Sequence, residues 1–193
     1  MRTFTTLLFV LSGTISLFGQ AIPVGQDTTV CPNDTVQISA TFNNSGFIYL
    51  DDAIELSLDD DAYSDVLNMG FTFLFFNDTT SNVIIGSNGV ITFRNSAANG
   101  YCPWSPVTPL PNPTAQLRSI YCPWYDYDTS TVIRYKTIGT APNRQFIVQY
   151  IPHMTNCTGS WTTTIVLSET LNTIDYYINN KPACVTGPAG IIN

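Results

Sequence analysis

Two aspartates in the second half of the chain are the clearest candidates for acid–base or metal chemistry. Asp126 and Asp128 are two residues apart, so on a β-strand their side chains would project from the same face. Glycosidases use two carboxylates about 5 to 9 Å apart, and calcium is bound by clustered oxygen ligands. Further acidic groups lie at 51–52 and 59–61, without the spacing of an EF-hand. The sequence therefore allows calcium at Asp126 and Asp128, with a solvated acidic turn as the alternative.

The other components of a catalytic centre are missing from the sequence. It contains no G-x-S-x-G elbow, no P-loop, no G-x-G-x-x-G and no H-E-x-x-H motif. The single histidine, His153, could activate a thiol such as Cys157 only if that cysteine stayed reduced. We therefore predict that the chain is not an enzyme. The catalytic hypothesis that remains needs a cleft in which Asp126 and Asp128 converge.

A four-residue motif occurs twice, as Tyr-Cys-Pro-Trp at 101–104 and again at 121–124. One interpretation is a pair of strand-end loops joined by a Cys102–Cys122 disulfide, with both tryptophans packed over it. The other is an exposed aromatic platform for a ligand, made by Trp104, Trp124 and Tyr127. The flanking residues of the two copies differ, so the motif does not indicate a repeat architecture.

The N-terminus predicts export. Arg2 precedes the apolar segments 7–11 and 15–18, which are too short to span a bilayer, and small or polar residues follow at 19–21. This pattern is typical of a secretory signal peptide, here residues 1–20. No later stretch approaches the ~18 apolar residues of a transmembrane helix. We expect a secreted or cell-surface protein with no transmembrane segment.

Charge and cysteine content restrict which binding partners, disulfides and metal sites we expect. The net charge of −7 and the absence of basic clusters argue against a nucleic-acid partner. An exported chain encounters an oxidising environment, so its five cysteines are expected to form disulfides. We predict the pairs Cys102–Cys122 and Cys157–Cys184, each of which brackets a modest loop, with Cys31 left over. A zinc framework is not indicated, because no C-x-x-C pair is present.

Short alternating segments predict the elements that must position these residues. A polar lead-in strand or linker at 21–44 precedes a series of β-type segments. Only residues 53–68 are ambiguous between helix and strand. Turn signals recur roughly every 8 to 12 residues, which predicts an all-β, antiparallel two-sheet β-sandwich of jelly-roll or immunoglobulin-like type with little helix. A proline-rich loop covers 99–114. The predicted strands of the module are 70–76, 83–85, 90–93, 131–138, 145–151, 161–167, 173–178 and 189–192.

The order of three central motifs carries a resemblance to known extracellular modules. They are MGFTFLFFN at 69–77, VIIGSNGVITF at 83–93 and IYCPWYDYD at 120–128, followed by VIRY at 132–135. This order resembles the N-terminal β-sandwich module of type IX-secreted, gliding-associated bacterial surface proteins. It also resembles the nidogen-like domain of animal adhesion proteins. The resemblance covers residues 45–193 and implies surface display and adhesion. The matching motifs of these families contain no catalytic residues, so the resemblance implies none in this chain.

These observations predict a non-catalytic extracellular module of an adhesion or gliding-associated protein. Its expected partner is a surface glycan, a protein ligand or further modules of the same chain. The alternative is a carbohydrate-binding module of a secreted hydrolase, for which a flat exposed patch of Trp104, Trp124 and Tyr127 would be the sign. We expect no cofactor, with calcium at the clustered carboxylates as the alternative. The apolar end at 189–193 and the unpaired Cys31 predict that the chain continues into further modules.

Overall fold

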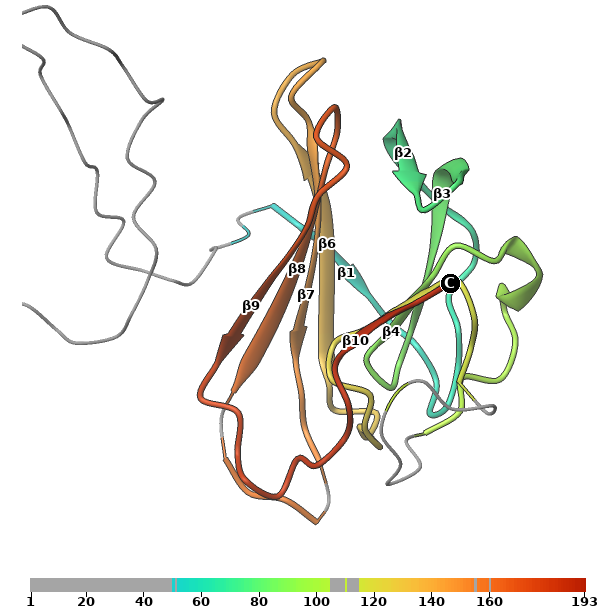
Figure 1. The fold of residues 1–193 in the computed structure, drawn as a ribbon. Helices are drawn as coiled ribbons and strands as arrows, with labels where there is room; N and C mark the ends of the chain where they lie inside the picture. Colours follow the sequence, from blue (N-terminus) through green and yellow to red (C-terminus); the bar gives the residue numbers. More distant parts are fainter. Residues whose placement is uncertain (1–49, 51, 105–109, 111–114, 155, 160) are drawn as a thin grey trace, which may run out of the picture. The chain divides into compact units, whose positions relative to one another are not determined.

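The burial pattern of one long strand shows why this chain forms two packed sheets. In strand β2 (Leu67–Phe75) the side chains of Met69, Phe71, Phe73 and Phe75 are buried, and the residues between them are exposed. A strand with this period-two pattern must cover its apolar face with a second layer. The computed structural model describes residues 50, 52–104, 110, 115–154, 156–159 and 161–193 (Figure 1). The predicted signal peptide, the lead-in segment and Cys31 lie outside these residues.

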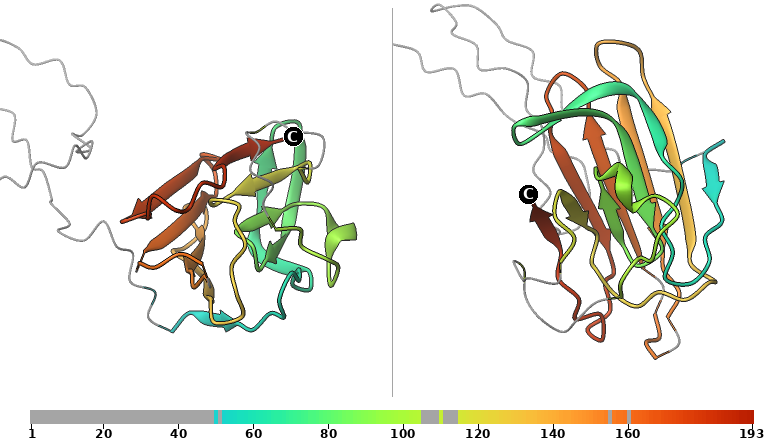
Figure 2. Two further views of the ribbon diagram at one scale, coloured as in Figure 1. Left: turned by 90° about the horizontal axis from the view of Figure 1, so that it is seen from below. Right: turned by 90° about the vertical axis from the view of Figure 1, so that its right-hand side faces the viewer.

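Two five-stranded sheets make up the fold, and every strand pair is antiparallel (Figures 1 and 2). The only helix in the described part of the chain is a 3-10 turn, η1 (Asn95–Ala97). The prediction of an all-β, two-sheet sandwich is therefore confirmed. The first sheet has the order β1 (Ile54–Leu56), β6 (Val132–Ile138), β7 (Gln145–Ile151), β8 (Thr162–Ser168) and β9 (Ile174–Asn179). The second has the order β10 (Gly190–Ile192), β5 (Ser119–Tyr121), β4 (Val90–Thr92), β3 (Asp78–Gly86) and β2.

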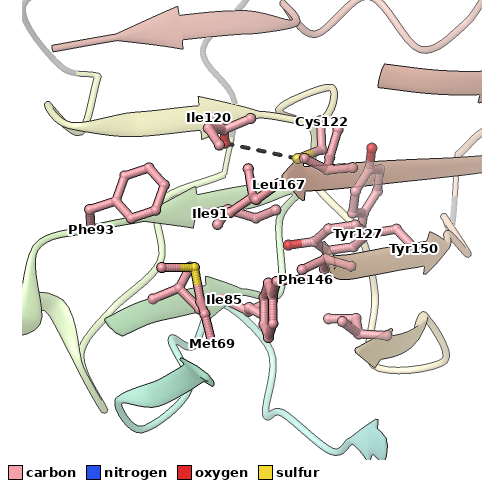
Figure 3. Close-up of a cluster of buried hydrophobic side chains, with 14 of the residues drawn as sticks. Met69, Ile85, Ile91, Phe93, Ile120, Cys122, Tyr127, Phe146, Tyr150 and Leu167 are labelled. Carbon is pink, nitrogen blue, oxygen red and sulfur yellow. Dashed lines mark hydrogen bonds between the residues drawn. The ribbon is translucent and has the colours of Figure 1, made fainter. Parts of the chain in front are cut away.

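The main core lies between the sheets. Phe146 from the first sheet and Ile85 and Ile91 from the second are fully buried there, and Figure 3 shows them facing one another. Aromatic rings fill much of this space, with Phe75 and Phe93 only 4.5 Å apart between ring centroids. Each such side chain stabilises the fold by about 1.5–3 kcal/mol when it is fully buried. The two sheets are thus held together mainly by apolar burial.

A second, smaller core covers the outer face of the second sheet. Tyr63 packs there against Ile84, Val90, Tyr121 and Trp124, with few of their atoms exposed. Isolated bridges pair Ala62 with Tyr101 and Tyr63 with Gly86. The segments around residues 62–63 and 101 therefore pack on the outer face of the second sheet. This extra layer was not predicted from the sequence, where residues 53–68 were ambiguous. It fixes the loops that carry the candidate site.

The open edge of β2 is covered by the end of β6 and by turns of the first sheet. Thr137 Oγ1 donates to the carbonyl of Met69 at 2.8 Å, and Asn172 Oδ1 accepts from the backbone N–H of Leu74 at 2.7 Å. Arg144 donates to the carbonyl of Gly70 and pairs with Glu169 at 2.5 Å. Edge strands present unpaired backbone groups, and these contacts satisfy several of them. No helix in the described residues is long and apolar enough to cross a membrane.

Candidate functional site

The β3–β4 hairpin places one end of the second sheet directly against the second Tyr-Cys-Pro-Trp motif. Its three-residue loop ends at Gly89, which has a positive φ of 72°. A Cβ atom at this position would lie 2.2 Å from the carbonyl oxygen of Pro123. Only glycine combines this conformation with so close an approach. The hairpin loop therefore sits tightly on the chain at 122–125.

Asn88, in the same loop, holds three separate segments together. Its side chain is fully buried, and its Nδ2 donates to Asp61 Oδ1 at 2.7 Å and to the carbonyl of Cys102 at 3.0 Å. Its Oδ1 accepts from the backbone N–H of Tyr127 at 3.1 Å. A buried amide with its donors and acceptor satisfied fixes the geometry of all its partners. Asn88 was not predicted as a site residue, because an asparagine before glycine is also the ordinary signal of a hairpin turn.

Two aromatic side chains project from the loops that Asn88 anchors. Tyr101 is 63% exposed and Trp104 is 53% exposed, whereas Trp124 and Tyr127 are fully buried. Trp124 Nε1 donates to the carbonyl of Pro103 at 2.7 Å, and the Tyr127 hydroxyl donates to the carbonyl of Pro123 at 2.8 Å. The predicted platform of Trp104, Trp124 and Tyr127 is therefore not formed. Trp104 is accompanied at the surface by Tyr101, which the sequence analysis did not propose for binding.

The cysteines form one of the two predicted disulfides. Cys157 and Cys184 are bonded, as predicted, and tie the chain after β7 to the chain after β9. Cys102 and Cys122 are free, so the prediction of a bridge between them is wrong. Cys122 lies two residues after Ile120 and points with it into the core between the sheets (Figure 3). Cys102 packs in the core on the opposite face of that sheet.

Burial makes both free thiols unreactive. It raises the pKa of the Cys102 thiol to about 12 and the pKa of the Cys122 thiol well above its usual range. The thiolate is the nucleophilic form of cysteine, and it is disfavoured at both positions. These two residues act as small apolar side chains, and neither is a candidate nucleophile.

Asp126 and Asp128 lie in different electrostatic environments. Partial desolvation, followed by repulsion from the carboxylates of Asp61 and Asp60, raises the pKa of Asp126. Desolvation also acts to raise the pKa of Asp128, but hydrogen bonds from His153 Nδ1, at 2.5 Å, and from the Ser130 N–H, at 2.9 Å, lower it overall. The structure therefore gives the two carboxylates different partners: His153 for Asp128 and the Asp60–Asp61 pair for Asp126.

Neither aspartate belongs to a recognisable metal site. No group of three or more His, Cys, Asp or Glu side chains in the described ranges is arranged to hold a metal ion. Calcium binding at Asp126 and Asp128 stays a prediction. His153 is exposed on the surface beside Asp128, and its backbone N–H and carbonyl are both hydrogen-bonded to Thr131. The Asp128–His153 pair therefore closes the loop that joins Asp128 to β6.

Tyr101, Trp104 and their acidic neighbours Asp60, Asp61 and Asp126 form what we call the loop surface. Desolvation and then the negative charge of Asp61 raise the pKa of Tyr101, and Asp126 adds to this effect. The two exposed rings can stack against a sugar face or an apolar side chain, and the carboxylates can accept hydrogen bonds. This combination suits reversible binding, and the surface offers no nucleophile and base held in hydrogen-bond contact.

Comparison with models of protein families identifies the family of this chain. A model of the family described as NIDO related matches residues 36–191, which is most of the chain. The chain belongs to the NIDO-related family. This membership agrees with the nidogen-like motif order and, together with the Cys157–Cys184 disulfide, with an extracellular module. Searches for similar curated proteins and for similar solved structures gave no match.

Proposed function

We propose that this chain is a non-catalytic extracellular module of a cell-surface adhesion protein and that it binds its ligand through the loop surface. The observation that carries the proposal is the exposure of Tyr101 and Trp104 on loops that the buried Asn88 holds in place. Tyrosine and tryptophan dominate the binding energy of many protein interfaces. A rigid support lowers the entropy lost when such side chains bind. NIDO-related family membership supports the extracellular setting.

Export by the type IX route and a role in gliding belong to the same proposal. They are supported by the order of the central motifs, which resembles that of gliding-associated surface proteins. The test is to locate the protein in the producing bacterium by protease treatment of intact cells. The chain should be cleaved at the surface of normal cells and protected in a mutant that lacks type IX export. Equal protection in both strains would contradict the surface assignment.

The second candidate is a carbohydrate-binding module of a secreted hydrolase. Exposed aromatic rings are a suitable surface for sugar stacking, and Tyr101 and Trp104 are both more than half exposed and only three residues apart. Burial of Trp124 and Tyr127 removes two of the three residues that the sequence analysis assigned to this function. The binding assay therefore includes both an array of immobilised glycans and the surface of the producing cells.

The experiment measures retention of beads coated with the secreted chain on these two targets. The Tyr101→Ala/Trp104→Ala variant should lose at least about ten-fold in retention, because truncating central aromatic residues typically costs 2 kcal/mol or more. The matched control is Tyr177→Ala, which removes an exposed tyrosine from β9 in the first sheet. Unchanged retention of the double variant, with wild-type thermal unfolding, would contradict a role for the loop surface. Retention on glycans alone would favour the carbohydrate-binding alternative.

The non-catalytic part of the proposal has its own test. The wild-type chain should release no product from polysaccharides or peptides over a long incubation. Turnover that is abolished in the Asp126→Asn/Asp128→Asn variant would show that the chain is an enzyme. The same variant with wild-type unfolding and no change in any assay supports a binding module.

A further inference from the structure

A polar pocket of about 360 Å³ lies on the second sheet at the end opposite the hairpin loop that supports the loop surface. It is formed where β3 begins, where β4 ends and where the chain enters β5. The β3–β4 turn and the chain after β5 support the loop surface at the other end of these strands. The pocket and the loop surface are therefore separated by the length of the strands. The lining residues are Thr79, Thr80, Phe93, Arg94, Asn95, Ser96 and Arg118.

Two arginines line this pocket in a chain that has only seven lysines and arginines and a net charge of −7. Arg134 and Arg144 pair with Glu55 and Glu169 at 3.2 and 2.5 Å. Arg94, by contrast, makes no ion pair with any residue in the described part of the chain. A cation without a partner beside a polar cavity is available to an anionic ligand.

Arg118 is paired incompletely. Its Nε lies 3.5 Å from Asp78 Oδ2, and this buried nitrogen has no hydrogen-bond acceptor among the described residues. The contact with Asp78 is longer than the roughly 2.7–2.9 Å of a charge-assisted hydrogen bond, so Asp78 compensates the charge of Arg118 only weakly. Arg94, Arg118 and Asp78 together carry one net positive charge, which a single monoanion would neutralise.

The backbone holds Arg118 in an unusual conformation. Its φ of 55° lies in the left-handed region, which is uncommon for residues other than glycine. The Arg118 carbonyl accepts from the N–H of Phe93 at 3.0 Å and from Thr92 Oγ1 at 3.3 Å. These bonds to the end of β4 fix the residue next to the pocket. Strained residues that the surrounding structure fixes in this way cluster at ligand sites.

We propose that this pocket binds the carboxylate of an acidic saccharide between Arg94 and Arg118. The planar guanidinium group matches a carboxylate through two parallel N–H···O bonds. The hydroxyl and amide groups of Thr79, Ser96 and Asn95 are suited to sugar hydroxyls. A volume of this size falls within the range of small-molecule sites. The proposal does not depend on the loop surface, because it uses none of the residues there.

The experiment titrates the secreted chain with D-glucuronate at low salt and follows amide chemical shifts by NMR. Saturable shifts should centre on residues 79–80, 94–96 and 118. The Arg94→Gln variant should bind at least about ten-fold more weakly, because one charge-assisted pair contributes about 1.5–3 kcal/mol. The matched control is Arg134→Gln, which removes an exposed arginine from β6 and should leave the affinity unchanged. Arg94 is exposed, so its replacement should not impair folding.

Three further probes separate this site from simpler ones. D-glucose should give no saturable shifts at these residues, because it lacks the carboxylate. Acetate and inorganic sulfate should bind at least about ten-fold more weakly than glucuronate, because they lack the sugar hydroxyls. Equal binding of glucose, or of acetate or sulfate, would overturn the assignment to an acidic saccharide, and so would the absence of any saturable shift. A failure of bead retention through Tyr101 and Trp104 would leave these expectations unchanged.

Discussion

The two copies of Tyr-Cys-Pro-Trp have the same four residues and opposite environments. In the first copy Tyr101 and Trp104 are more than half exposed, and in the second Tyr121 and Trp124 are fully buried. The second copy continues β5, which pairs with β4 on one side and with β10 on the other. Within the described residues, the strand pairing of the first copy is limited to the isolated bridge from Tyr101 to Ala62. Position within a sheet, and not local sequence, decides which aromatic side chains are available for binding.

The copies also support one another. Trp124 Nε1 donates to the carbonyl of Pro103, so the buried copy holds the backbone of the exposed one. Asn88 reaches both, through the carbonyl of Cys102 and the N–H of Tyr127. An arrangement in which one copy gives rigidity and the other gives contact area is consistent with a preorganised binding surface. The predictions below test this division of roles, beginning with the largest effect.

Replacement of the two tryptophans should give very different stability changes. Trp124→Ala should lower the free energy of unfolding by about 3–5 kcal/mol, because it leaves a cavity in the outer core and removes the bond to Pro103. Trp104→Ala should change it by no more than about 0.5 kcal/mol, as is usual for a surface residue. Urea unfolding followed by tryptophan fluorescence and circular dichroism measures both. Equal destabilisation by the two changes would contradict the division of roles.

The cysteines provide the second contrast. Replacing Cys157 and Cys184 together by alanine should cost about 3–4 kcal/mol, because the bond closes a loop with a sequence separation of 27 residues. Peptide mapping without reduction should show that bond and unlinked Cys102 and Cys122. Both thiols should react with iodoacetamide only after denaturation, because burial raises their pKa. A Cys102–Cys122 peptide in the native protein would contradict the structure.

Apolar, β-branched and aromatic segments identified most of the strands in advance, both where burial alternates, as in β2, and where it is nearly continuous, as in β7. The segment at 145–151 coincides with β7, and 131–138 differs from β6 by one residue. The pattern failed at β5, where Ser119, Ile120 and Tyr121 are all buried because both faces of this strand are covered. It also failed for Trp124 and Tyr127, whose burial depends on segments distant in the sequence. No local signal distinguishes Asn88 as a buried link from asparagine in an ordinary turn.

Asn88→Ala should loosen the loop that holds the exposed Tyr-Cys-Pro-Trp copy at 101–104. The change removes the three side-chain hydrogen bonds to Asp61, Cys102 and Tyr127 and should lower the free energy of unfolding by about 2–4 kcal/mol. Ligand retention through Tyr101 and Trp104 should fall as well, although neither residue is altered. The control is Asn179→Ala, an exposed asparagine at the end of β9, which should affect neither measurement. A stable variant with full retention would show that the loop surface does not need this anchor.

The smallest expected effect comes from the two aspartates that follow the second copy. The pKa of Asp126 is raised in the folded state, so the fold binds its proton more tightly than the unfolded chain does. The contribution of Asp126 to the free energy of unfolding therefore falls as the pH rises above about 3.9, which is the pKa of an unperturbed aspartate. It stays at the lower level once the pH exceeds the raised pKa of the folded state. Asp126→Asn should thus stabilise the protein slightly at pH 7, by no more than about 0.5 kcal/mol for so exposed a residue.

Asp128 should respond with the opposite sign. Its folded pKa is lowered, so its contribution is present above about pH 3.9 and is lost as the pH falls through the lower folded value. Asp128→Asn should therefore destabilise the protein at pH 7, by up to about 1 kcal/mol, because the pair joins a half-buried aspartate to an exposed histidine. The effects of both substitutions should shrink towards zero below pH 3, where the carboxyl groups are increasingly protonated in both states. Urea unfolding from about pH 2 to 7 measures the two curves. Changes of the same sign would contradict the different environments that the structure gives to Asp126 and Asp128.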